Sequence, residues 1–130
     1  MDRKSHGLFV AVKWAKKDLD MLASDTFAPT AGMISAAKRG LELRSEFHRG
    51  GTPVGIARAR SISNGQNLPM GTVKAMYSFF ARHEVDKSGK DFDNAAKPSN
   101  GKIAWLLWGG DAGATWAGAI RGRAIAAEVW

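Results

Sequence analysis

The sequence predicts an all-α fold, a compact orthogonal bundle of five to six helices with a helix-turn-helix-like central pair. Apolar residues recur at helical spacing along most of the chain, and no segment has a convincing strand pattern. The segments RGGTP at 49–53 and WGGDA at 108–112 share one order: helix end, two glycines, capping residue, new helix. Such joints restart a helix at a steep angle, which favours a compact bundle over a coiled coil.

Size and composition indicate one domain. The chain has 130 residues, and we expect a single helical domain over 1–130. Within it, 1–28 form an N-terminal helix and linker, 29–117 the core, and 118–130 the end of the last helix. The absence of cysteine excludes disulfides, zinc–thiolate sites and thiol catalysis. No apolar run approaches the roughly 20 residues that span a bilayer, and the basic start lacks a signal-peptide cleavage site, so we expect no membrane contact.

Helical spacing predicts the first two helices. One runs from about 7 to 23, and the segment SDTFAPT ends it. Thr30 or Pro29 opens the second, which continues to about 48. Its apolar residues lie three or four positions apart, as on the buried face of a helix: Met33, Ala37 and Leu41.

Capping residues predict the next two helices. After the two glycines of RGGTP, Thr52 is a good N-cap and Pro53 a good first residue for a helix that reaches about 64. Gly65 then adopts the left-handed conformation that ends many helices. A short connector leads to a helix over about 69–83. Its apolar stripe consists of Met70, Val73, Met76, Tyr77 and Phe80.

Two further helices follow a polar segment at 84–100. This segment is long for a connection in a bundle, and long loops are often functional. Ser99 or Asn100 caps the helix GKIAWLLW, and Asp111 caps a last helix that continues to near the C-terminus. Carboxylates gather in the polar segment, but their spacing does not match a calcium-binding EF-hand loop. We therefore expect a solvated loop, with no metal, no other cofactor and no enzymatic activity.

The charge of the chain is unevenly distributed. The formal net charge of +7 favours polyanionic partners, nucleic acid first and acidic protein surfaces second. No Asp or Glu occurs between Phe47 and His83, and we call this segment the acid-free stretch. Its basic side chains are Arg49, Arg58, Arg60, Lys74 and Arg82.

Residues 52–80, within the acid-free stretch, have the length and spacing of a helix-turn-helix. In such a unit the second helix enters the major groove of DNA. The predicted nucleic-acid-binding residues are Arg49, Thr52, Arg60, Thr72 and Lys74. Their contacts would be mainly to phosphate, and therefore salt-dependent and weakly selective. The alternative interpretation is an ordinary helical hairpin inside a bundle.

The two arginines of ARAR have different predicted roles because residues two positions apart on a helix point in different directions. Arg58 lies at the edge of the inward stripe, and we predict a structural ion pair with Glu84, Asp86 or Asp111. Arg60 lies roughly on the opposite side of the helix, where we predict that it contacts an external partner. RGGTP is also typical of an anion site at a helix N-terminus. It lacks the spacing of a nucleotide-binding loop, so we interpret it as a joint between helices.

The tryptophans divide into core and interface candidates. Trp105 and Trp108 lie on one helical face, and Trp116 follows on the next helix, so we expect all three to anchor the core. Trp14 and Trp130 have no obvious core to enter. We predict that these two contribute to a protein–protein interface, where tryptophan is enriched.

Four segments carry a resemblance to a known family. RGLELR at 39–44, RGGTPVGIARAR at 49–60, LPMGTVKAMYSFFARHEVDK at 68–87 and PSNGKIAWLLWGGDAG at 98–113 resemble a small helical domain that recurs in tailed-phage and prophage proteins. Such domains occur alone or joined to phage head-assembly proteins. The resemblance implies that 29–117 form a phage-associated core. It assigns no residue a role, but it favours a virion, assembly or DNA-binding role over a metabolic enzyme.

These observations lead to two functional hypotheses. The leading one is a non-enzymatic phage protein that binds DNA through a basic helical surface, in genome packaging or host takeover. The alternative is a small structural or assembly protein of the virion, a head or tail component that acts through contacts with other phage proteins. Either role places the protein in the host cytoplasm or the virion, and an oligomer is compatible with both.

Overall fold

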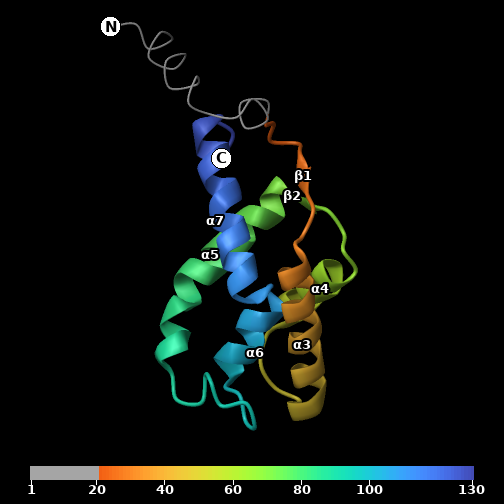
Figure 1. Ribbon diagram of the computed structural model, residues 1–130, viewed down its shortest axis with the longest axis vertical. Helices are drawn as coiled ribbons and strands as arrows, with labels where there is room; N and C mark the ends of the chain where they lie inside the picture. The colour runs from red at the N-terminus through yellow and green to blue at the C-terminus, as the bar shows by residue number, and fades with distance from the viewer. Residues whose placement is uncertain (1–20) are drawn as a thin grey trace, which may run out of the picture.

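The computed structural model describes residues 21–130 and confirms the all-α class (Figure 1). Residues 21–23, the end of the first predicted helix, are not helical, and the rest of that helix lies outside the described residues, as does Trp14. The α-helices are α3 (Ala31–Phe47), α4 (Pro53–Ser63), α5 (Met70–His83), α6 (Asn100–Leu107) and α7 (Gly110–Ala126). A 3₁₀-helix η1 (Glu84–Ser88) follows α5, and two short strands are β1 (Thr26–Phe27) and β2 (Leu68–Pro69).

Side-chain caps begin three of the helices, as the sequence predicts. The hydroxyl of Thr30 accepts from the Met33 N–H at 3.2 Å, and that of Thr52 accepts from the Gly55 N–H at 3.1 Å. Ser99 caps α6 in the same way. Each hydroxyl satisfies one of the N–H groups that the first turn of a helix leaves without a partner.

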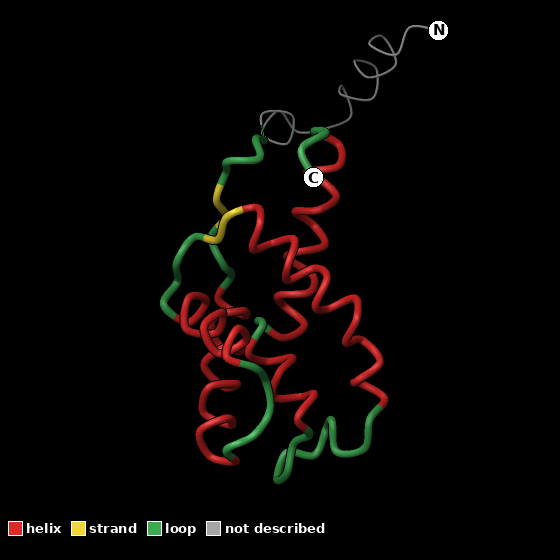
Figure 2. Tube along the Cα trace, turned by 180° about the vertical axis from the view of Figure 1, so that it is seen from behind, coloured by secondary structure: helices red, strands yellow, loops and turns green. Residues whose placement is uncertain are grey.

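The sequence analysis did not predict the two short strands. β1 pairs with β2 in antiparallel orientation, with Thr26 opposite Pro69 and Phe27 opposite Leu68. Figure 2 shows this pairing at the end of the molecule opposite the loop that joins α5 to α6. Two residues are too few for an alternating pattern, so only tertiary packing reveals them.

The helices form two groups that share α7 and surround one core. α3 lies against α4, α6 and α7, whereas α5 lies mainly against α7 and crosses it obliquely in Figure 1. The fully buried side chains include Met33, Ile62, Met76, Trp105 and Ile120. α4 and α5 are consecutive, but each packs mainly on other helices, unlike the tightly paired helices of a DNA-reading unit. In residues 21–130, no helix combines the length and the apolar character needed to cross a bilayer.

Asp111 does not cap α7, contrary to the prediction. Gly109, with a φ of 111°, occupies the cap position, and α7 begins at Gly110. Asp111 lies in the first turn, where its Oδ1 accepts from Trp105 Nε1 at 2.9 Å and from Lys87 Nζ at 3.0 Å. The helix therefore begins two residues earlier than predicted, and the Asp111 carboxylate links η1, α6 and α7.

This junction makes stability depend on pH. The hydrogen bond from Lys87 lowers the pKa of Asp111, and the same bond raises the pKa of Lys87. The contribution of Asp111 to the free energy of unfolding is therefore complete above its unfolded-state pKa. It is lost as the pH falls through the lowered folded-state pKa. The contribution of Lys87 to the free energy of unfolding is lost only as the pH rises through the raised pKa of its ammonium group. Because the Asp111 side chain is 78% exposed, water screens the pair.

We expect Asp111→Asn to lower the free energy of unfolding by at most about 1 kcal/mol at pH 7. The asparagine oxygen still accepts from Trp105, so this variant removes only the charge. Asp111→Ala also removes that acceptor, and the nearly buried indole N–H then adds a cost of about 1 kcal/mol or more. Urea unfolding at neutral and strongly acidic pH checks both. The loss of unfolding free energy in Asp111→Asn should vanish in acid. A loss that persists in acid would contradict the pH dependence expected from the lowered pKa of Asp111.

Candidate nucleic-acid interface

Arg49, predicted to contact nucleic acid, is engaged within the protein. Its Nη1 donates to Asn100 Oδ1 and its Nη2 to the carbonyl oxygen of Pro98, both at 2.7 Å. Its guanidinium lies 5.1 Å from the ring centroid of Phe47. These contacts tie the loop after α3 to the start of α6. The contact of Arg49 with nucleic acid stays a prediction, because a guanidinium has five N–H donors and these two bonds leave others available.

Arg58 has a structural role, but it does not form the predicted ion pair with a described residue. Its Nη1 donates to Thr72 Oγ1 at 3.4 Å, and its guanidinium lies 5.5 Å from the Trp108 ring. Within residues 21–130 its buried Nε has no hydrogen-bond partner. The carboxylates that were expected to pair with it contact other bases: Asp86 contacts His83, whereas Glu84 and Asp111 contact Lys87.

The two threonines of the predicted surface also serve the fold. Thr52 Oγ1 caps α4, and Thr72 Oγ1 accepts the hydrogen bond of Arg58. Thr72 therefore lies on the side of α5 that meets Arg58 of α4. Both hydroxyls act only as acceptors in these bonds, and their contact with nucleic acid stays a prediction.

Arg60 and Lys74 are both exposed, but they do not share a surface. Arg58 marks the side of α4 that meets α5, and Arg60 lies about 200° further around the helix. Thr72 marks the side of α5 that meets α4, and Lys74 lies about 200° from it. The two exposed cations consequently point away from each other. The central pair therefore does not present the predicted residues as one interface.

The structure groups Lys74 with partners that are distant in sequence. Lys74 Nζ lies 5.5 Å from the Trp130 ring centroid, and the Arg121 guanidinium lies 5.9 Å from it. Arg121 is also 4.7 Å from the Tyr77 ring, which meets Trp130 edge to face at 5.9 Å. We call these four residues the cation–aromatic cluster. Trp130, predicted as a protein-interface residue, is partly buried here against the core.

The cluster continues into the outward face of α5. The exposed residues of α5, which we call the α5 surface, are Gly71, Lys74, Ala75, Ser78, Ala81 and Arg82. They include two cations and no acid, and their other side chains are small enough for close approach by a partner. Lys74 and Arg82 are about 12 Å apart along the helix axis. No described carboxylate forms an ion pair with Lys74 or Arg121.

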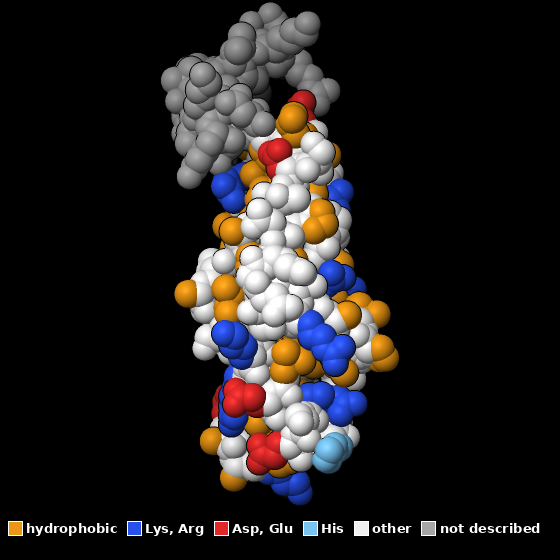
Figure 3. Space-filling model, turned by 90° about the vertical axis from the view of Figure 1, so that its right-hand side faces the viewer, with side chains coloured by type: hydrophobic (Ala, Val, Ile, Leu, Met, Phe, Trp, Pro, Cys, Tyr) orange, Lys and Arg blue, Asp and Glu red, His pale blue; other side chains and the backbone are white. Residues whose placement is uncertain are grey.

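The side of the molecule that carries α3 and α4 is different. Figure 3 shows its Lys and Arg side chains in separate groups along the length of the molecule, with Asp and Glu side chains towards both ends. Arg39 of α3, for example, is 3.9 Å from Glu42. A dispersed pattern with acids close to bases provides a weaker field for a polyanion than the acid-free α5 surface.

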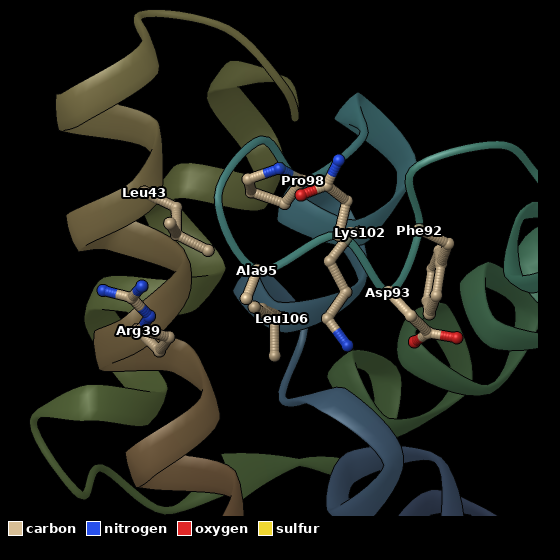
Figure 4. A pocket seen from close by; sticks show the side chains of 9 residues that line it. Arg39, Leu43, Phe92, Asp93, Ala95, Pro98, Lys102 and Leu106 are labelled. Atoms are coloured by element: carbon tan, nitrogen blue, oxygen red, sulfur yellow. The ribbon is translucent and has the colours of Figure 1, made fainter.

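A pocket of about 300 Å³ lies between α3 and α6 (Figure 4). Its walls are largely apolar and include Leu43, Phe92, Pro98 and Leu106. Lys102 crosses it with Nζ 4.7 Å from the Phe92 ring centroid, and Arg39 points away from the other lining residues. Because Arg39 and Lys102 point in different directions, this pocket offers no converging set of donors for a phosphate.

The polar segment after α5 forms η1 and an ordered loop. Asn94 Oδ1 accepts from the N–H groups of Ala96 and Lys97, which fixes one turn. Phe92 is buried against Trp105 at a centroid distance of 6.5 Å. Within residues 21–130, no three or more His, Asp or Glu side chains are grouped so that they could hold a metal ion.

No protein-family model, curated protein or solved structure matches this chain.

The sequence did not predict the cation–aromatic cluster, because its members come from α5, α7 and the C-terminus. The sequence signals for it were the exposed position predicted for Lys74 and the absence of an obvious core position for Trp130, which was predicted to lie in a protein interface.

Proposed function

We propose that the protein binds nucleic acid, duplex DNA first, through the cation–aromatic cluster and the adjoining α5 surface. The observation that supports this most is the position of Lys74 and Arg121 over aromatic rings, with no carboxylate among the exposed residues of α5. The net charge of +7 acts in the same direction, because it attracts a polyanion over longer distances.

The geometry favours contact with the phosphate backbone. A cation over a ring keeps its charge and its N–H donors, and it is already partly ordered, so binding a phosphate costs less conformational entropy. The faces of Tyr77 and Trp130 are occupied by these cations, and unstacked bases would have to displace them. Binding should therefore be weakly selective for sequence and strongly dependent on salt.

The resemblance to phage and prophage domains supplies a biological setting for this proposal. A small basic protein of a phage meets DNA during genome packaging and during takeover of the host. Contacts with other phage proteins in the virion are the alternative role, and the binding experiment below discriminates between the two.

We expect Lys74→Ala and Arg121→Gln each to weaken duplex binding by about five- to tenfold at low salt, since each removes a phosphate contact. Each should also reduce the slope of log K against log salt by about one unit. Fluorescence anisotropy of a labelled duplex, measured between about 50 and 200 mM salt, gives both quantities.

Arg60→Ala is the matched control because it removes one exposed cation from α4, away from the α5 surface. It should change affinity by less than about twofold, through net charge alone. Equal losses for all three variants would indicate diffuse attraction and contradict a specific surface. Absence of duplex binding at low salt would overturn the proposal and favour the assembly role.

A further inference from the structure

A second pocket, of about 370 Å³, lies where α4 begins. The joint before α4 contributes Gly51 and Thr52, the end of α5 contributes Arg82 and His83, and α6 with its C-cap contributes Asn100 and Trp108. A volume of this size suits a small molecule. The pocket brings together the two ends of the acid-free stretch.

One wall of the pocket is a column of stacked rings. Phe79 stacks on Trp108 at a centroid distance of 4.7 Å and on His83 at 4.4 Å. His83 Nδ1 also donates to Asp86 Oδ2 at 3.0 Å, which fixes the orientation of the imidazole. The other ring nitrogen, Nε2, has no partner among the described residues and remains for a ligand.

Trp108 has an unusual hydrogen-bonding state. Its residue surface is only 8% exposed, and a Cβ built on Gly55 would lie 3.1 Å from its Nε1. The indole N–H edge therefore faces the first turn of α4, beside Thr52. Trp105 and Trp116 donate their indole N–H groups to Asp111 and to the Ala28 carbonyl oxygen. Trp108 Nε1 has no acceptor in the described part of the chain, and it is not among the fully buried side-chain nitrogens that lack a partner, so it remains open to solvent or a ligand.

The charges around the pocket favour an anion. Arg82 is exposed at its edge, and the Arg58 guanidinium lies 5.5 Å from the Trp108 ring without a carboxylate partner among residues 21–130. Asp86 is the acid that lines the pocket, and it is paired with His83. The N-terminus of α4 adds the positive end of a helix dipole.

We propose that this pocket binds a phosphate monoester. Trp108 Nε1 and Arg82 donate to its oxygens, and the imidazole of His83 lines the same pocket. A phosphate monoester has three terminal oxygens, which suits donors that come from both α5 and the C-cap of α6. The same group occurs on small metabolites and at the 5′ end of a nucleic acid strand. The site shares Arg82 with the α5 surface but includes no residue of the cation–aromatic cluster, so it can bind phosphate whether or not the protein binds duplex DNA.

The indole N–H of Trp108 provides a direct measurement. In a ¹H–¹⁵N spectrum each tryptophan side chain gives its own signal, and Trp108→Phe identifies the one for Trp108. We expect inorganic phosphate, added at constant ionic strength, to shift that signal saturably and more than those of Trp105 and Trp116. No shift, or an equal shift with chloride, would overturn the proposal.

Variants connect this shift to the pocket. Arg82→Gln should weaken phosphate binding by about tenfold, because it removes a charge-assisted hydrogen bond from an exposed side chain without disturbing the core. Arg60→Gln and Lys74→Ala should leave phosphate binding unchanged, so failure of the duplex-binding proposal would leave this result intact. An Arg82→Gln variant that binds phosphate normally would contradict the assigned donors.

Two oligonucleotide probes distinguish the sources of the phosphate. If the occupant is a strand end, a short 5′-phosphorylated oligonucleotide should bind more tightly than inorganic phosphate and shift the same signal. If it is a small metabolite, inorganic phosphate should bind at least as well as the oligonucleotide. Equal shifts of the Trp108 signal with 5′-phosphorylated and unphosphorylated strands would show that the phosphate monoester is not recognised.

Discussion

Gly40→Ala should lower the free energy of unfolding by about 3 kcal/mol or more, because the crossing of α3 and α6 has no space for a side chain. A Cβ at Gly40 would lie 2.7 Å from the backbone nitrogen of Leu107 and 3.0 Å from the carbonyl carbon of Leu106. Both are backbone atoms, so no rotamer change relieves the contact. The two helices would have to separate and lose packing along their whole contact.

Gly122→Ala is the matched control for this prediction. Gly122 also lies inside a helix, α7, but nothing lies within 4 Å of a Cβ built there. Alanine is the better helix former, so we expect this variant to gain about 0.5–1 kcal/mol. Urea unfolding measures both variants, and a similar change for the two would show that the crossing is not as close as described.

Trp105→Ala should lower the free energy of unfolding by about 3–5 kcal/mol, the usual cost of removing a large buried aromatic side chain. Trp105 is 2% exposed and packs against Phe80 at a centroid distance of 4.8 Å. Its indole N–H bonds Asp111, and Lys87 Nζ lies 4.6 Å from its ring. The variant therefore opens a cavity and breaks the junction of η1, α6 and α7 together.

Two substitutions separate these contributions. Trp105→Phe keeps most of the ring packing and should cost clearly less than the alanine variant. Trp116→Phe removes an indole N–H that bonds the Ala28 carbonyl oxygen at a partly exposed site, and it should cost less than about 1 kcal/mol. Thermal unfolding followed by circular dichroism checks all three, and an alanine variant as stable as the parent would contradict the central position of Trp105.

Local signals in the sequence predicted most of the fold. Thr30, Thr52 and Ser99 cap helices where expected, and Gly65 has the expected positive φ of 70°. These signals act between residues three or four positions apart, so they are complete within a short segment. The error at Asp111 has a local cause too, since either glycine before it can end one helix and begin the next.

The candidate sites could be predicted only in part. Arg60 and Lys74 are exposed, as their helical positions indicated, but the relative orientation of α4 and α5 decides that they face apart. Arg49 was predicted to contact nucleic acid, and no pattern in the sequence indicated its hydrogen bond to Asn100, which lies 51 positions away in the chain. A long side chain such as that of arginine can bond any acceptor that tertiary packing brings near. The helical spacing of apolar residues in the sequence does not indicate which acceptor that is.

The sequence by itself determined the helices, their caps and a stretch without acids, because propensity, capping and charge are properties of neighbouring residues. Only the tertiary structure decided which cations are used internally and which remain exposed. It brought Lys74 and Arg121 to Trp130 and Tyr77, and it placed Trp108 and His83 in one pocket. The physical reason is that these groupings depend on how α5 packs against α7 and α6, which is set by the whole buried core.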